Sequence, residues 1–377
     1  MAIEFATPAS EAEPLKQSPL AALNASLGAR LVPFAGYEMP VQYRGGIIAE
    51  HMQCRNAAAL FDVSHMGQAS LRGAAAARAL EALVPSDITG LKPGRQRYSL
   101  LLNEAGGIRD DFMVAALAPD QLFLVVNASR KDGDFAWISE NLPDEVSLER
   151  HDDRALVALQ GPKAAEAFGR LSPEAASLGF MQTATLRIAG ADVLVSRSGY
   201  TGEDGFEISV PRSAAEGFAR TLLDQPEVAP AGLGARDCLR LEAGLCLYGN
   251  DIDELTTPIE AGLAWTIAKR RRTTLDFPGA EAIRDQMASG PARVRIGLRP
   301  EGRAPARAGV EIAAEDGTRA GIVTSGSFGP SVGAPIAMGY VRRDLAADGT
   351  PLFLLVRGQS LPARVASLPF VPHRYIR

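Results

Sequence analysis

The sequence has few of the residues from which metal sites and disulfide frameworks are built. It contains three cysteines and four histidines among 377 residues. Cys54, Cys238 and Cys246 form no Cys-x-x-Cys pair, so neither a disulfide framework nor a zinc knuckle is indicated. The histidines are scattered and make no His-Glu-x-x-His pattern. We therefore expect no metal site, and a reducing compartment fits this cysteine usage best.

The chain also lacks the segments that direct a protein into or through a membrane. No apolar run approaches the roughly 18 residues of a membrane span. The first 17 residues carry Glu4, Glu11 and Glu13 beside two prolines, without the positive and apolar regions of a signal or transit peptide. We predict a flexible tail over residues 1–18, no membrane association and a cytoplasmic location.

A surplus of positive charge is absent as well. Lys and Arg number 39 against 44 Asp and Glu, which gives a formal net charge of −5 and no support for nucleic-acid binding. There is no Walker A motif, and Gly232-Leu-Gly234 lacks the third glycine of a dinucleotide fingerprint, so no nucleotide cofactor is predicted. No Gly-x-Ser-x-Gly elbow occurs, and nothing indicates a covalent nucleophile.

What the chain does have is the composition of a globular protein, with 46% hydrophobic and 22% charged residues. At 377 residues it is too long for one ordinary core. Helix and strand patterns alternate in an α+β fashion over residues 19–272, and Pro278-Gly279 marks a boundary. Short strands with Gly-rich turns then predict a small β-barrel or sandwich over residues 285–377.

Two adjacent carboxylates, Asp110 and Asp111, interrupt a segment that otherwise has a strand pattern. A carboxylate facing an apolar interior is unfavourable unless it is paired, and Asp is depleted in strands. Successive strand side chains point to opposite faces, so the two cannot form one dyad: if one faces solvent, the other faces the interior. A following strand at residues 121–126 would bring Asn127 almost opposite Asp111. Alternatively, both Asp lie in the turn after Gly106-Gly107.

A second polar cluster occupies residues 198–210, where Asp204-Gly205 is a strong hairpin signal. Apolar residues alternate after this turn toward a core, which leaves Glu207 on the other face. In a cavity Glu207 could accept two parallel N–H donors such as those of a pterin, and Tyr200 could supply a hydroxyl or a ring. On an open surface, the commoner case, Glu207 would simply be solvated.

Arg236 and Arg240 are four residues apart in a predicted helix and therefore share one face, with Asp237 and Glu242 available as partners. One interpretation is an ordinary salt-bridged surface. The other is a site for an anionic tail such as a glutamyl carboxylate. The basic run at residues 269–272 is interpreted as a solvated boundary loop that could dock an acidic partner.

Ten longer motifs complete the description of the chain. They are residues 34–40, 61–66, 106–111, 158–162, 198–210, 235–253, 257–265, 323–326, 337–340 and 369–372. Taken together, they resemble the T-proteins of the glycine cleavage system, a family of aminomethyltransferases, over nearly the full length from Pro19 to Arg377.

This resemblance implies a three-lobed, cloverleaf-like folate-binding fold of the α+β class. Two interleaved α+β lobes are expected over residues 19–272, with the C-terminal β-barrel over residues 285–377, and tetrahydrofolate in the central hole. It also implies the reaction. An aminomethyl group on the lipoyl arm of the H-protein loses ammonia, and its carbon passes to tetrahydrofolate as 5,10-methylene-tetrahydrofolate. Tetrahydrofolate is thus the expected co-substrate, and lipoylated H-protein is the expected partner.

The resemblance assigns the essential carboxylate to Asp111 and leaves Asp110 as a structural partner turned toward solvent. A carboxylate near the transferred carbon stabilises an iminium-like cation and orients the attacking folate nitrogen. Trp265 is expected to pack close by. The folate-binding positions that the resemblance implies are Glu207, Arg236, Tyr200, Tyr98 and Asn127, with Arg307 and Tyr375 contributed by the C-terminal lobe.

Two other kinds of protein share this expected fold and remain alternatives. One is a folate-dependent S-demethylase that acts on a sulfonium substrate, and the other is a non-catalytic folate-binding iron–sulfur maintenance protein. The latter family carries a Lys-Gly-Cys motif, and no such tripeptide occurs here. Flavin-linked sarcosine or dimethylglycine dehydrogenases fuse this module to a dinucleotide domain, which this chain lacks. Ammonia release from an aminomethylated lipoyl carrier that requires tetrahydrofolate would separate these activities.

Overall fold

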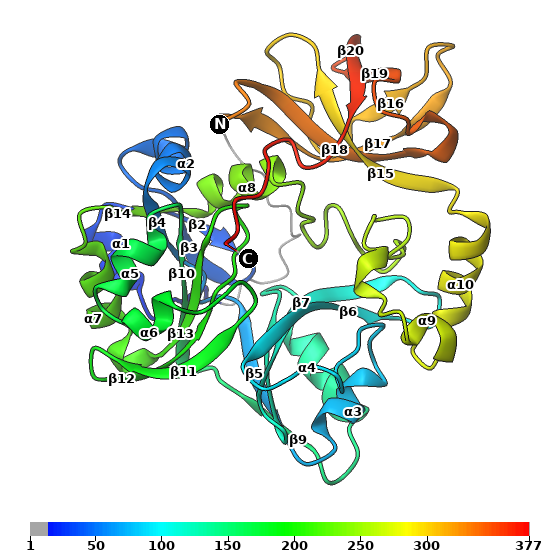
Figure 1. Cartoon of the computed structure of the whole chain (residues 1–377). Coiled ribbons are helices and arrows are strands. Elements are labelled where there is room, and N and C mark those ends of the chain that lie inside the picture. Colours follow the sequence, from blue (N-terminus) through cyan, green and yellow to red (C-terminus); the bar gives the residue numbers. More distant parts are fainter. Residues whose placement is uncertain (1–13, 377) are drawn as a thin grey trace.

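A computed structural model describes residues 14–376, and these residues form three lobes around a shared middle (Figure 1). The lobes are centred on a six-stranded sheet, a five-stranded sheet and a closed six-stranded barrel. Each has its own cluster of buried apolar side chains. The predicted α+β, three-lobed fold with a C-terminal barrel is confirmed. Within the described residues, no helix is both long and apolar enough to cross a membrane.

The first lobe takes its strands from two distant stretches of the chain, in the order β11-β12-β13-β10-β4-β14. β4 (Ala58–Asp62) lies between the antiparallel β10 (Arg154–Gln160) and the parallel β14 (Val228–Ala231). Phe168, Phe206 and Phe218 meet edge to face in its core. The other elements are β11 (Thr183–Ile188), β12 (Ala191–Ser196), β13 (Gly205–Pro211), α1 (Ala21–Ser26), α2 (Gly46–Asn56), α5 (Ala164–Gly169), α6 (Pro173–Ala176), α7 (Arg212–Leu223) and α8 (Leu233–Glu242).

A small sheet of β1 (Lys16–Gln17), β2 (Arg30–Phe34) and β3 (Tyr37–Gln42) adjoins this lobe. β1 pairs with β3, and the buried Ser18 donates a hydrogen bond of 2.5 Å to Asp62. Both features lie inside the stretch predicted as a flexible tail, and both are parts of the fold. Residues 1–13, the rest of that prediction, lie outside the described residues.

The second lobe is inserted between β4 and β10, with the strand order β6-β7-β8-β5-β9. Both Asp110 and Asp111 lie inside β7, so the alternative that placed them in the preceding turn is wrong. Phe112 and Val114 on one face of β7 pack with Phe135 and Ile138 of the unpredicted helix α4. The elements are β5 (Gly67–Arg72), β6 (Arg95–Leu102), β7 (Ile108–Ala118), β8 (Gln121–Val126), β9 (Ser147–Arg150), α3 (Ala76–Glu81) and α4 (Lys131–Glu140).

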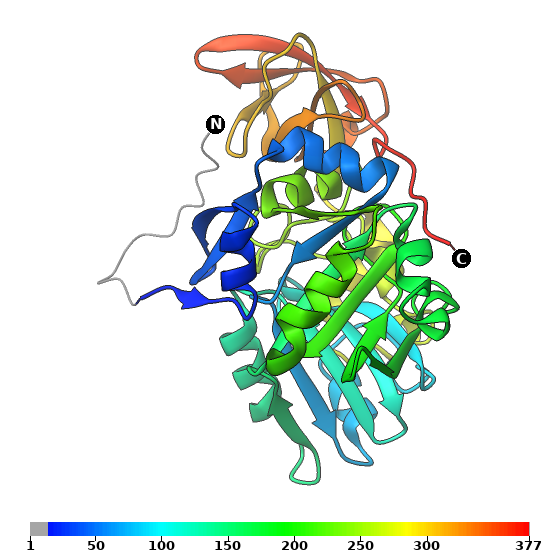
Figure 2. The same ribbon diagram turned by 90° about the vertical axis from the view of Figure 1, so that its left-hand side faces the viewer.

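The third lobe is the barrel, closed in the order β15-β18-β17-β16-β19-β20. Gly321 is required in it, because a Cβ atom there would lie 1.8 Å from the Tyr340 carbonyl oxygen. Figure 2 shows α2 and α8 beneath the barrel and the C-terminal segment running back along the first lobe. The strands are β15 (Arg293–Pro300), β16 (Glu311–Ala313), β17 (Arg319–Gly329), β18 (Ala334–Arg342), β19 (Pro351–Val356) and β20 (Gln359–Ala366).

The segment before the barrel includes the basic run at residues 269–272, which was interpreted as a solvated loop. That interpretation is wrong for Arg271, which is only 1% exposed and donates to the carbonyl oxygens of Glu81 and Val84 at the end of α3. Arg270 is exposed, as expected, and pairs with the carboxylates of Glu81 and Asp87. Both arginines thereby connect this segment to the second lobe. The short helices of this part are η1 (Ala264–Thr266), α9 (Arg271–Thr274), α10 (Ala280–Ser289) and, after β18, η2 (Arg343–Leu345).

Candidate active site

The Asp111 carboxylate is held by donors from the two strands that flank β7. Tyr98 on β6 donates its hydroxyl to Oδ2 at 3.0 Å, and Asn127, directly after β8, donates from Nδ2 to Oδ1 at 2.8 Å. Burial and the neighbouring Asp110 raise the pKa of Asp111 to about 7, although both donors oppose the rise. Near neutral pH, the Asp111 carboxyl is therefore present in both its ionised and its protonated form.

Asp110 does not face solvent, and that prediction is wrong. Its side chain is fully buried on the face of β7 that α4 covers. It accepts hydrogen bonds from the backbone nitrogen of Asn127 at 3.0 Å and from Asn127 Nδ2 at 2.9 Å. The two carboxylates point to opposite faces, as strand alternation requires, yet both reach the same amide group of Asn127.

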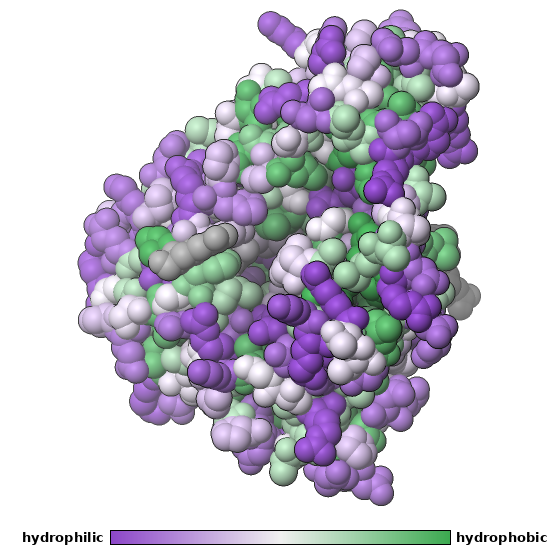
Figure 3. Space-filling model, turned by 45° about the vertical axis from the view of Figure 1, so that its right-hand side comes forward, coloured by the Kyte–Doolittle hydropathy of each residue, from purple (hydrophilic) through white to green (hydrophobic). Residues whose placement is uncertain are grey.

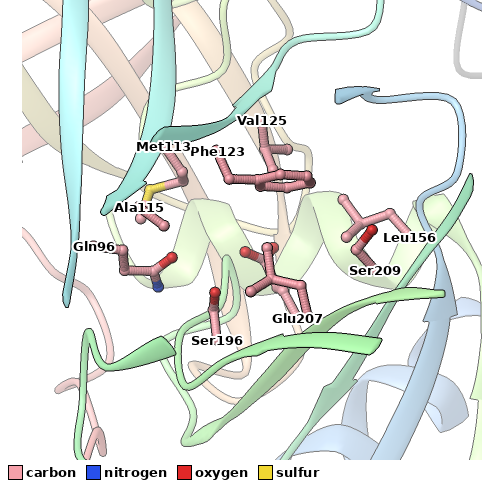
Figure 4. Close-up of a pocket in the computed structure, with 10 residues that line it drawn as sticks. Gln96, Met113, Ala115, Phe123, Val125, Leu156, Ser196, Glu207 and Ser209 are labelled. Atoms are coloured by element: carbon pink, nitrogen blue, oxygen red, sulfur yellow. The ribbon is translucent and has the colours of Figure 1, made fainter. Parts of the chain in front are cut away.

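The first and second lobes face each other across a narrow pocket, and Glu207 is directed into it (Figure 4). Glu207 is partly buried and accepts a hydrogen bond of 3.2 Å from Ser198 Oγ. It is therefore not a freely solvated surface residue. The second lobe lines this pocket with Gln96, Met113, Ala115, Phe123 and Val125, and the first lobe lines it with Leu156, Leu194, Ser196, Glu207 and Ser209.

Arg236 on α8 lies over the ring of Tyr200, with its Cζ atom 4.9 Å from the ring centre. Its Nη1 is buried and has no hydrogen-bond partner within the described part of the chain. Burial lowers the pKa of Arg236, and Glu207 opposes that effect. An N–H group buried without an acceptor is unfavourable, and a bound ligand that offers an acceptor would satisfy it.

The remaining residues of that helix exclude the salt-bridged-surface interpretation. Arg240 is 3% exposed and pairs with Asp251 at 2.7 Å as well as with Asp237. Glu242 is fully buried and pairs with Arg55 of α2. Arg240 and Glu242 thus fasten α8 to its neighbours, while Arg236 lies over Tyr200 and near Glu207.

Tyr200 lies near both Asp111 and Arg236, and Arg236 in turn lies near Glu207. Burial raises the pKa of Tyr200, and the Asp111 charge adds to the rise. The Tyr200 hydroxyl donates to the carbonyl oxygen of Cys246, and Arg236 lies over one face of its ring. Trp265 stacks on Tyr98 with ring centres 5.4 Å apart, so it packs beside the site as expected.

The two C-terminal positions differ from one another. Tyr375 stacks on Phe180 at 4.5 Å and borders Glu207; burial raises its pKa to about 12, and Glu207 contributes to this shift. Arg307 is exposed and donates to the Gly326 carbonyl oxygen at 3.2 Å. The interactions described above connect Tyr98, Asp111, Asn127, Tyr200, Glu207, Arg236 and Tyr375, and none of those found within residues 14–376 brings Arg307 to them.

Sequence reasoning missed all five second-lobe residues that line the pocket, and two of them lie beside predicted site residues. Met113 is two residues beyond Asp111 on β7, and Gln96 is two residues before Tyr98 on β6. Strand alternation alone would have placed each on the face of its predicted neighbour. Asp134 was also missed, because Gly133 obscures the helix pattern of α4.

The arrangement at this region has three chemical capacities. It offers one titratable carboxylate, a second carboxylate inside a pocket, and an arginine with an unpartnered N–H group. The surface between the barrel and the other two lobes is hollowed on the face shown in Figure 3. A flat heterocycle with adjacent N–H donors and an acceptor fits these groups.

Comparison with known proteins identifies the family. Residues 20–271 match the family described as GCVT N-terminal domain, and residues 293–372 match the family described as glycine cleavage T-protein C-terminal barrel domain. The chain is similar to the mitochondrial aminomethyltransferase of Gallus gallus, at 48% identity over 97% of this chain and 95% of the relative. It is also similar to that of Pisum sativum, at 44% identity over 98% of this chain and 92% of the relative.

A solved structure gives the same result. The crystal structure of glycine cleavage system aminomethyltransferase T from Bartonella henselae has a TM-score of 0.92 at 43% identity, covering 96% of this chain and 100% of that one. Fold and sequence therefore agree, and the chain belongs to the glycine cleavage T-protein family of aminomethyltransferases.

Proposed function

We propose that this aminomethyltransferase accepts the aminomethyl group from the dihydrolipoyl arm of the H-protein and passes its methylene carbon to tetrahydrofolate. Ammonia is released and 5,10-methylene-tetrahydrofolate forms. Family membership over nearly the whole chain supports the reaction. The cytoplasmic location stays a prediction, since the relatives named above are mitochondrial proteins, and cell fractionation tests it.

Asp111 is the proposed catalytic residue, and the observation that carries this role is its position. It is a partly buried carboxylate fixed by Tyr98 and Asn127 on the pocket-facing side of β7. Ionised Asp111 stabilises the positive charge that develops on the carbon as it leaves its nitrogen. The same carboxylate orients the attacking folate nitrogen, so a single carboxylate suffices.

Glu207 and Arg236 are the proposed folate-binding residues, with Tyr200, Tyr98, Asn127, Tyr375 and Arg307 around them. The Glu207 carboxylate accepts the two adjacent N–H donors of the pterin. Arg236 Nη1, which is buried without a partner, donates to an acceptor atom of the folate. The Tyr200 ring supplies a flat apolar surface, because its hydroxyl is held by the Cys246 carbonyl.

The test is substitution of Asp111 by asparagine, followed by assays of ammonia release from aminomethylated H-protein and of tetrahydrofolate binding. We expect turnover to fall by about 10³-fold while the fold and folate binding persist. Asp132→Asn, an exposed position that pairs with Arg150, is the matched control. Near-normal ammonia release from the Asp111 variant would rule out its role. Ammonia release that does not depend on tetrahydrofolate would exclude the proposed reaction.

A further inference from the structure

A second carboxyl group lies behind the one proposed to do the chemistry. Asp110 on β7 is 0% exposed, and Asp134 on α4 is 1% exposed. Their side chains are in hydrogen-bonding contact with each other. Two ionised carboxylates are both acceptors only, so this contact requires a proton on one of them. The reaction assigned to Asp111 makes no use of this buried pair.

The cations near the pair do not neutralise it by direct bonding. Arg109 and Arg130 lie close enough to Asp134 to favour its ionised form. Arg109 lies over the ring of Trp137, and Arg130 pairs with Glu254. Neither guanidinium donates a hydrogen bond to Asp110 or Asp134 among residues 14–376. The groups that face the pair are therefore Asp111, Arg109, Arg130, Glu254 and Tyr248.

Burial and the like charge of the neighbour both oppose the presence of two negative charges on Asp110 and Asp134. Burial, and next to it the charge of Asp134, raises the pKa of Asp110 well above its ordinary value. Burial likewise raises the pKa of Asp134. Asp134 Oδ2 has no hydrogen-bond partner within the described residues, so a second negative charge there would be uncompensated. Like charges at contact distance cannot both ionise readily, which leaves the pair with one negative charge.

Asn127 connects this pair to Asp111. Its Nδ2 lies 2.9 Å from Asp110 Oδ1 and 2.8 Å from Asp111 Oδ1, and its backbone nitrogen donates to Asp110 Oδ2. Asp110 thereby fixes the orientation of the amide that in turn fixes Asp111. The charge on Asp110 also acts on Asp111 directly, since it is second only to burial in disfavouring the ionised form of Asp111.

We propose that Asp110 and Asp134 share one proton, and that this buried pair, acting through Asn127, positions Asp111 and governs how readily Asp111 takes up a proton. The inference rests on the proposed role of Asp111. Asp110 and Asp134 touch no substrate in this scheme, and they are positioning residues. The position of the shared proton decides how much negative charge stands next to Asp111.

The shared proton is tested without any turnover. Infrared spectra of the free enzyme, recorded as the pH is raised through the titration of Asp111, should keep the carbonyl band of one protonated carboxylic acid after Asp111 has ionised. Asp110→Asn and Asp134→Asn should each remove the same band, since the remaining carboxyl then ionises beside an amide donor. Asp132→Asn, on the same helix but exposed, should keep it. A band that survives either substitution within the pair overturns the shared proton.

The effect on Asp111 is tested by the acid limb of kcat/KM against pH. Asp110→Asn leaves the charge on the more distant Asp134, so the apparent pKa of the acid limb should fall by about one unit or more. Asp134→Asn leaves the charge on Asp110, so this apparent pKa should stay the same or rise. Asp132→Asn should leave it unchanged.

Two outcomes of that experiment have separate meanings. Lowered rates with the same limb in every variant would show a merely structural role and overturn the inference. If the wild-type enzyme itself released no ammonia, the proposed function would be refuted. The infrared experiment would still show whether Asp110 and Asp134 share a proton. Thermal unfolding of each variant shows whether it is folded when it is measured.

Discussion

Buried charged groups occur in two regions of this molecule, and the two regions treat them differently. Where α2, α8 and the loop before β13 meet, Arg55 pairs with Glu203 at 2.6 Å and with Glu242 at 2.9 Å. Hydrogen bonds from His51, Ser331 and Arg55 outweigh burial and lower the pKa of Glu242 to about 2. Every partner of that carboxylate favours its ionised form, so this region is built to stay charged.

At the candidate active site the same residue types lack such partners. The side chains that donate to Asp111 within residues 14–376 are a tyrosine and an asparagine, and its pKa is raised to about 7. Arg236 stacks on Tyr200 and keeps an unpartnered N–H group. Paired buried charges fasten the elements of the first lobe to one another, whereas unpaired ones are available to a ligand or a proton. The comparison predicts opposite effects of mutation on stability in the two regions.

The largest expected effect is at the buried ion pairs of the first lobe. Arg55→Ala leaves Glu242 buried without its cation and should lower the free energy of unfolding by about 3–5 kcal/mol. Arg72→Ala removes an exposed pair with Glu149 and should change it by less than about 1 kcal/mol. Denaturant unfolding monitored by circular dichroism measures both variants. Equal losses in the two would contradict the importance of burial.

At the site the sign should be reversed. The folded-state pKa of Asp111 lies above its unfolded value, so its contribution to stability is present below about pH 4 and is lost as pH rises toward 7. Asp111→Asn should therefore stabilise the protein at pH 8 by on the order of 1–2 kcal/mol, with the gain vanishing near pH 4. Unfolding free energies at both values test this, and a loss of stability at pH 8 would contradict the comparison.

A smaller effect is expected in the kinetics of the wild type. The ionised form of Asp111 is the active one, so kcat/KM should be constant above about pH 7 and fall tenfold, or about 1.4 kcal/mol, for each pH unit below it. The measurement is ammonia release at low carrier concentration over a range of pH. An acid limb near pH 4, the ordinary range of an Asp, would show that the environment of Asp111 does not perturb it.

The smallest effect on stability should come from Arg236. Arg236→Met keeps much of the stacking on Tyr200 and removes an N–H group that has no acceptor, so the free energy of unfolding should change by less than about 0.5 kcal/mol. Tetrahydrofolate binding should weaken at the same time by about tenfold. Calorimetric titration with tetrahydrofolate checks the binding. A large loss of stability together with unchanged affinity would show that Arg236 stabilises the fold and does not bind tetrahydrofolate.

Much of the fold followed from local patterns. The strand at residues 121–126 and the barrel strands have the alternation and turn residues expected of them, and β8 spans Gln121–Val126. The face of Glu207 followed from the hairpin beside it. Helix α4 did not follow, since Gly133 and its acidic neighbours resemble a loop. Without α4, the partner of Asp110 could not be foreseen.

The sequence by itself determined that Asp110 and Asp111 point to opposite faces of one strand, because alternation is a property of the backbone. It also determined, through its motifs, the family and the residue proposed to do the chemistry. Only the tertiary structure decided which face is covered. α4 packs on the Asp110 side and the first lobe faces the Asp111 side, so the residue expected in water is the buried one. Which face of a strand is buried depends on segments distant in the chain, so a local sequence pattern cannot predict it.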